Sequence, residues 1–167
     1  MIENLEEIIR KIGKKDERIV GIIRSLYEEI GKLRGRRDEF NDNLDKIIES
    51  AINNARERYR IPINLYPSDK KGRCQEMCVC YAVNKWNARS NARIPGFKNV
   101  VSWLSNYWLK CKDINKATLI ITTAWDEKDF CKSSNLKDRI DSYTVHSDKT
   151  VVIVLLTAES ISLQYIK

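Results

Sequence analysis

The sequence predicts a protein of mixed α and β structure (α+β or α/β), with a long N-terminal coiled-coil helix followed by a small mixed-sheet domain. Three observations predict it. Apolar residues recur every seven positions through the first third of the chain, two later stretches are almost wholly apolar, and Pro and Gly separate the elements in between. We therefore divide the 167 residues into a coiled-coil oligomerisation helix, residues 1–58, and a basic α/β domain, residues 59–167.

The first element is defined by steps of three and four residues that alternate from Ile2 to Asn54. Thirteen of these sixteen positions are apolar, and Asp16, Arg37 and Asn54 are the exceptions. A strict seven-residue period indicates helices that supercoil, so we expect self-association through residues 2–54. The alternative is a helical hairpin that turns near Gly31 and Gly35, and the number of associated chains stays open.

The later elements are predicted from short apolar runs and from the turn residues between them. The most informative is the second predicted strand, which has apolar side chains on both faces and so fits a central strand, although a helix over residues 74–86 competes with it. The expected order is a hairpin of strands 61–66 and 73–84, a helix over 97–112, a strand over 117–124, a helix over 135–143, a strand over 151–156 and an edge strand over 160–166.

The charge is concentrated in the middle third. Residues 59–112 hold ten Lys and Arg against two acids, a net charge of +8, whereas residues 1–58 have a net charge of zero and residues 113–167 of −1. The same middle region also contains most of the aromatic residues that could stack on exposed bases. Phosphates attract such a cationic stretch, and aromatic faces stack on bases.

Nucleic acid is therefore the expected partner, with DNA favoured and RNA left open. An acidic protein or an anionic lipid surface is the alternative partner for a basic patch, and the aromatic residues of 103–108 also fit the core face of a helix. The candidate contacts are the basic residues of the two predicted connections and their flanks: Lys70, Lys71, Arg73, Lys85, Arg89, Arg93 and Lys98.

Several other classes of protein are not indicated. No apolar window is long enough to span a membrane, and the acidic N-terminus does not resemble a signal peptide, so we expect a cytoplasmic protein. The five cysteines have no zinc-site spacing and are expected to be reduced thiols in the core. We predict no metal site and no cofactor for a binding protein.

The order of these elements resembles that of restriction-endonuclease-like (PD-(D/E)XK) domains. It is also similar to archaeal and archaeal-viral proteins that join a coiled coil to such a domain. The resemblance implies an Asp on the first hairpin strand and Glu-x-Lys at the end of the second, which together hold Mg²⁺. Here the second strand ends Val83-Asn84-Lys85, and the first offers Asn64. The resemblance thus implies a scaffold that has lost its metal-binding acids and binds nucleic acid without cutting it.

Two other functions stay open. The first is a Mg²⁺-dependent nuclease whose carboxylates come from other positions, with Glu76, Lys85 and Asp126 as the candidate catalytic residues. The second is a scaffold protein whose basic patch binds an acidic partner.

Overall fold

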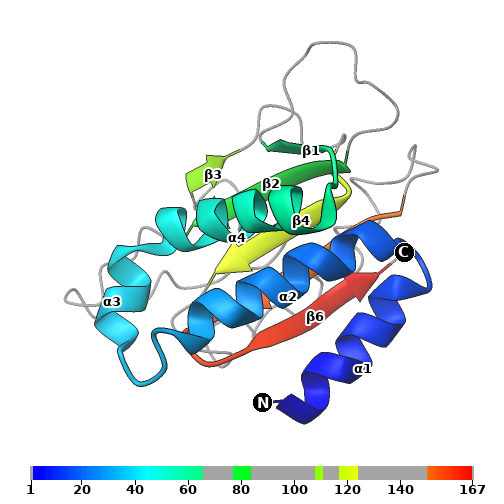
Figure 1. Cartoon of the computed structure of the whole chain (residues 1–167). Coiled ribbons are helices and arrows are strands. Elements are labelled where there is room, and N and C mark those ends of the chain that lie inside the picture. Colours follow the sequence, from blue (N-terminus) through cyan, green and yellow to red (C-terminus); the bar gives the residue numbers. More distant parts are fainter. Residues whose placement is uncertain (1, 66–76, 84–107, 111–116, 124–149, 167) are drawn as a thin grey trace.

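The computed structural model describes residues 2–65, 77–83, 108–110, 117–123 and 150–166. Four helices precede a sheet of six strands (Figure 1). The helices are α1 (Ile2–Gly13), α2 (Glu17–Gly31), α3 (Arg37–Asp42) and α4 (Leu44–Tyr59), and the strands are β1 (Ile63–Leu65), β2 (Met77–Val83), β3 (Trp108–Lys110), β4 (Leu119–Thr123), β5 (Val152–Leu156) and β6 (Ile161–Ile166).

The sheet is mixed, as predicted. Its strand order is β1-β2-β4-β5-β6, and β3 pairs with β2 beside β1. Strands β1, β2, β4 and β5 are parallel to one another, whereas β3 and β6 are antiparallel to their neighbours. Because β4 pairs with one edge of β2, strands β1 and β3 must share the other edge, β1 along its first half and β3 along its second.

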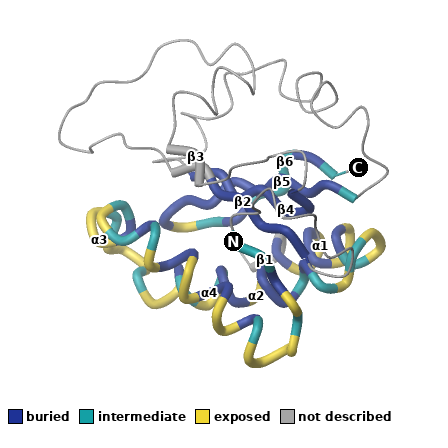
Figure 2. Tube along the Cα trace, turned by 90° about the horizontal axis from the view of Figure 1, so that it is seen from above, coloured by how far each residue is buried: buried dark blue, intermediate teal, exposed yellow. Residues whose placement is uncertain are grey.

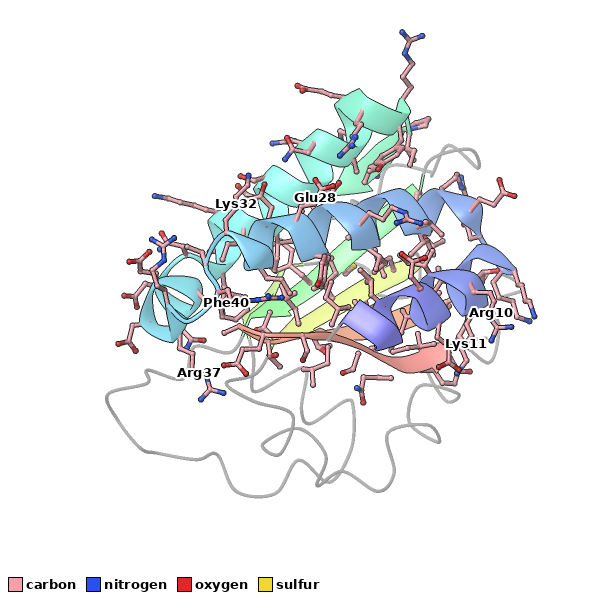
Figure 3. The ribbon with its side chains drawn as sticks, turned by 60° about the horizontal axis from the view of Figure 1, so that its bottom comes forward. Arg10, Lys11, Glu28, Lys32, Arg37 and Phe40 are labelled. Carbon is pink, nitrogen blue, oxygen red and sulfur yellow. The ribbon has the colours of Figure 1, made fainter. Side chains whose placement is uncertain are left out.

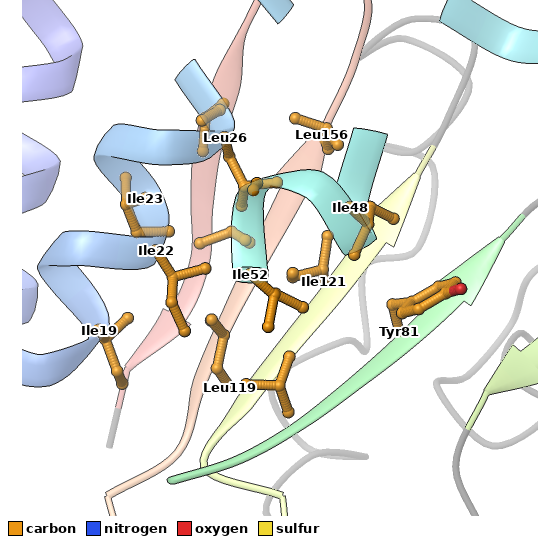
Figure 4. Packing of buried hydrophobic residues seen from close by; sticks show 14 of the residues in the cluster. Ile19, Ile22, Ile23, Leu26, Ile48, Ile52, Tyr81, Leu119, Ile121 and Leu156 are labelled. Atoms are coloured by element: carbon orange, nitrogen blue, oxygen red, sulfur yellow. The ribbon is translucent and has the colours of Figure 1, made fainter. Parts of the chain in front are cut away.

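The helices cover one face of this sheet (Figures 1 and 2). Alternate residues of the central strands, such as Val79, Leu119 and Val154, belong to one hydrophobic cluster with the apolar side chains of α1, α2 and α4. Figure 4 shows Ile22 of α2 and Ile52 of α4 packed over these strands. The helices of residues 1–58 and the strands that follow therefore share a single core.

The intervening strand residues are buried as well. Cys78, Cys80, Ile120 and Ile153 are each no more than 7% exposed, although they do not belong to that cluster. The central strands are thus apolar on both faces, which explains why they are near-continuous apolar runs in the sequence. The predictions of a central strand at β2, of buried strands at β4 and β5, and of an edge strand at β6 are confirmed.

The prediction of one long coiled-coil helix is wrong. The heptad region forms four separate helices, and its apolar positions are buried inside the chain, as at Ile12, Ile23 and Phe40, which are fully buried. An amphipathic helix that covers a sheet needs the same spacing of three and four residues as a coiled coil, so the pattern alone does not distinguish them. The interruptions arise at Asp16, which caps α2, and around Gly35, which has a φ of +80°.

Helices α2 and α4 run side by side, close together. A Cβ atom at Gly21 of α2 would lie 2.8 Å from Cδ2 of Tyr59 at the end of α4, so only glycine fits there without a shift. Outside this contact, Arg58 donates to Oε1 of Glu28 at 3.0 Å and Asn54 donates to Oε1 of Glu29 at 3.2 Å. The polar rims of the two helices are therefore joined to each other.

Two further predictions are corrected. Strands β1 and β2 pair in parallel, so they do not form the expected hairpin. Residues 108–110 form β3, although a helix was expected over 97–112. The rest of that predicted helix, the helix predicted over 135–143 and the turn between β1 and β2 lie outside the described residues.

The described cysteines differ from each other. Cys78 is buried and forms no disulfide, as expected, whereas Cys80 is disulfide-bonded, so the prediction of reduced thiols is wrong at that position. Both side chains point to the same face of β2, but residues i and i+2 of a strand lie about 7 Å apart, which is too far for a disulfide between them.

Candidate nucleic-acid interface

The predicted contact residues lie in two stretches of chain whose end points the structure defines. The first, residues 66–76, joins β1 to β2, and the second, residues 84–107, joins β2 to β3. The side chains themselves lie outside the described residues, as do the candidate catalytic residues: Lys70, Lys71, Arg73, Glu76, Lys85, Arg89, Arg93, Lys98 and Asp126.

The longer stretch begins and ends at one place. Val83, the last residue of β2, is the Cα partner of Trp108, the first residue of β3. Both ends of residues 84–107 are therefore anchored at the carboxyl end of β2. In sheets with parallel strands, ligands bind beyond the carboxyl ends of the strands, so Val83 and Trp108, which flank this stretch, lie at an edge suited to ligand binding.

The shorter stretch is anchored along the same edge of the sheet. It leaves β1 at Leu65, which is paired with Val79, and enters β2 at Met77, which is paired with Ile63. Both basic stretches are thus attached to the edge that β1 and β3 form on β2, at the opposite side of the sheet from β6. We call this edge, with the two stretches attached to it, the basic edge.

Helix α4 brings one carboxylate, that of Glu49, to β2, and a second carboxylate lies one turn away on the same helix. Helix α4 runs antiparallel to β2: near its end Arg56 donates to the carbonyl oxygen of Ile63 at 2.8 Å, and near its start Glu49 accepts from the hydroxyl of Tyr81 at 3.5 Å. Asp45 lies one turn before Glu49 on the same side of the helix. One oxygen of Asp45 is buried and has no hydrogen-bond partner within the described ranges.

These carboxylates were not among the predicted site residues. In the sequence they occupy polar positions of the heptad, where acids are common on any solvent-facing helix, and only the packing of α4 on β2 brings Glu49 to Tyr81. In the part of the chain that the structure describes, no group of three or more His, Cys, Asp or Glu side chains could hold a metal ion.

The cations at the end of α2 and the start of α3 are mostly paired with acids. Lys32 contacts Glu29 at 3.0 Å, and Arg36 contacts Glu39 at 3.2 Å. At the start of α3, Arg37 lies 3.6 Å from Glu159 in the turn between β5 and β6. The basic run over residues 34–37, which ends at Arg37 (Figure 3), is therefore part of a mixed-charge surface. It differs in this from the middle third of the chain, which has a net charge of +8.

No protein family, no curated protein and no solved structure matches this chain. The resemblance to restriction-endonuclease-like domains accordingly stays a prediction. None of the described helices is long and apolar enough to cross a membrane.

Proposed function

We propose that this protein binds nucleic acid through the basic edge. The observation that supports the proposal is the confinement of a net charge of +8 to residues 59–112, which comprise β1, β2, β3 and the two stretches between them. Neither the helix layer nor the β4–β6 side of the molecule has a comparable excess of cations, because residues 1–58 and 113–167 have net charges of zero and −1.

The chemistry of such an edge favours the sugar-phosphate backbone over the bases. Lys and Arg neutralise phosphates and release their counterions, which provides affinity without sequence preference. Arg89 and Arg93 each follow an Asn by two residues, with small side chains between them, so a phosphate backbone can come close. The aromatic residues of the same region would add stacking on unpaired bases.

Binding without cleavage is the form of this function that we propose. The resemblance would require acids at residues 64 and 83, where this chain has Asn64 and Val83, and neither an amide nor an aliphatic side chain replaces the carboxylates that bind Mg²⁺. Lys85 would then act as a phosphate contact. The cytoplasmic location that we expect is part of the same proposal.

The test is a titration of labelled single-stranded and double-stranded DNA and RNA with the whole protein, at several salt concentrations, with and without Mg²⁺ or Mn²⁺. Fluorescence anisotropy measures binding, and a denaturing gel of the same samples measures cleavage. We expect affinity to fall steeply as salt rises and all strands to stay intact. Cleavage that requires the metal would instead identify a nuclease, and absence of binding at low salt would refute the proposal.

Replacing both Arg89 and Arg93 by Ala should weaken binding to every sequence and reduce the salt slope by about two, because two phosphate contacts are lost. The matched control replaces the exposed Lys11 and Lys14 by Ala, which removes the same charge at the end of α1 (Figure 3). Helix α1 packs against β6, at the opposite edge of the sheet from the basic edge. If the two double variants lose the same affinity, only the net charge matters and the basic edge is not the interface.

A further inference from the structure

Tyr59, the last residue of α4, is a surface tyrosine whose ring packs on α2. Among the described residues it is the only large apolar or aromatic side chain that is exposed, at 39%. A Cβ atom at Gly21 would lie 2.8 Å from Cδ2 and 3.2 Å from Cγ of this ring, so the glycine makes room for it. Glycine inside a helix costs about 1 kcal/mol relative to alanine. Helix α2 is thus weakened at the position where the ring packs.

A second unfavourable feature follows directly after the ring. Arg60 has a left-handed backbone, with φ 51°, which is disfavoured for a residue that has a Cβ atom. Backbone conformations of this kind cluster at ligand-binding and catalytic sites. The costs at Gly21 and Arg60 arise independently, and both lie against one exposed aromatic ring.

Two cations flank this ring. The guanidinium of Arg58 lies 5.7 Å from the ring centroid, and its Nη1 atom contacts Oε1 of Glu28 at 3.0 Å. Arg60 is exposed and has no acidic partner within the described ranges. Residues 56–60 contain three arginines against one acid, a net charge of +2. An aromatic ring beside positive charge is the kind of surface on which single-stranded nucleic acids stack their bases.

The ring also lies close to the basic edge. Pro62 follows Tyr59 by three residues, and its carbonyl oxygen accepts from the amide of Met77 at 3.0 Å. Met77 is the residue at which the stretch over residues 66–76 joins β2. One end of that stretch is therefore fixed within a few residues of Tyr59.

We propose that Tyr59 stacks on one unpaired base of a single-stranded nucleic acid and that Arg60 contacts a phosphate of the same strand. This inference rests on the proposed function and specifies its substrate. Strands with unpaired bases should bind more tightly than duplexes, in which the bases are already stacked on one another. The ring adds no sequence preference, because every base has a face that can stack.

The test measures binding of the whole protein and its variants to four probes by fluorescence anisotropy: single-stranded DNA, single-stranded RNA, duplex DNA and an abasic single strand. Tyr59→Leu keeps an apolar side chain beside Gly21 and removes the aromatic face. We expect it to bind both base-bearing single strands about tenfold more weakly than the parent. Its affinity for the duplex and its salt slope should not change, since no charge is lost.

Two comparisons separate stacking from other roles of Tyr59. Tyr59→Phe keeps the aromatic face and should bind like the parent. On the abasic strand, which has phosphates but no bases, Tyr59→Leu and the parent should bind equally. Circular dichroism checks that each variant is folded.

Arg60 is tested without a change at Tyr59. Arg60→Ala should weaken binding to single strands and reduce the salt slope by about 0.7, because one phosphate contact is lost. Arg60→Lys keeps the charge and should keep the slope of the parent. An unchanged slope in Arg60→Ala would refute the phosphate contact.

The outcomes distinguish this inference from the proposed function. If the parent binds nucleic acid and Tyr59→Leu binds single strands equally well, or loses single-stranded and duplex binding alike, only the stacking site is refuted. The same holds if Tyr59→Phe is weakened as much as Tyr59→Leu, since the hydroxyl would then be the contact. If the parent binds no nucleic acid at low salt, the proposed function fails and this inference fails with it.

Discussion

Arg60 has the least favourable backbone conformation among the described residues other than glycine. It follows α4 with φ 51° and ψ 39°, and it is the only described residue with a side chain that has a positive φ. The left-handed region brings Cβ close to the following carbonyl oxygen, which costs about 1–2 kcal/mol. Helices commonly end with glycine at this position for that reason.

Replacing Arg60 by Gly should therefore stabilise the fold by about 0.5–1 kcal/mol, the steric relief less the greater flexibility of glycine in the unfolded chain. Urea denaturation followed by circular dichroism measures this change as a higher midpoint. Arg60→Ala is the control, because it removes the same charge and keeps Cβ. Equal midpoints for the two variants would show that the backbone conformation contributes nothing.

At the scale of elements, the helix layer is where the sequence-based prediction fails most clearly. Helical structure in this region can be predicted from the spacing of its apolar residues. Strands β4, β5 and β6 can be predicted from apolar runs and from the alternation of apolar and polar residues. The spacing of apolar residues does not predict which surface the helices cover, because the same apolar side of a helix can pack on a sheet or on a second helix. The direction of β1 relative to β2 was missed too, since it depends on the path of the chain between them.

Ile23→Asp tests which surface α2 covers. Ile23 is fully buried in the cluster shared with the sheet, so an unpaired carboxylate there should cost more than about 4 kcal/mol and unfold the whole chain. All four tryptophans lie after residue 59, so their fluorescence reports on the part of the chain that contains the sheet. A red-shifted emission is expected.

The control for that experiment is Arg24→Ala, on the exposed side of the same helix. Arg24 contacts Glu6 at 3.5 Å, and both side chains are largely exposed, so its loss should change stability by less than about 1 kcal/mol. If Ile23→Asp left the tryptophan emission unchanged, α2 would be independent of the sheet, as in the coiled-coil prediction.

At the scale of the whole molecule, the shared core makes the two halves of the chain depend on each other. A chain of residues 59–167 alone would expose the sheet face that Ile22, Ile48 and Ile52 cover, including fully buried Leu119 and Ile121 (Figure 4). We expect it to aggregate or to remain unfolded.

Size-exclusion chromatography and circular dichroism of residues 59–167 measure this outcome. Addition of a separate chain of residues 1–60 should recover soluble, folded protein, because it supplies the missing layer. A monomeric, cooperatively unfolding 59–167 chain would contradict the single core.

The candidate site could be predicted from the sequence only as a charged region. The net charge of a stretch can be counted from its residues, whereas the paths of residues 66–76 and 84–107 cannot be predicted in this way.

The packing of α1 against β6 joins the first element of the chain to the last. During synthesis on the ribosome, α1 emerges long before residues 161–166, so its apolar side has no complete binding site until β6 has been synthesised. Folding is then a late event that closes contacts across about 150 residues, and such long-range closure is slow. Nascent chains of this protein should accordingly be substrates for chaperones that shield exposed apolar helices until β6 leaves the ribosome.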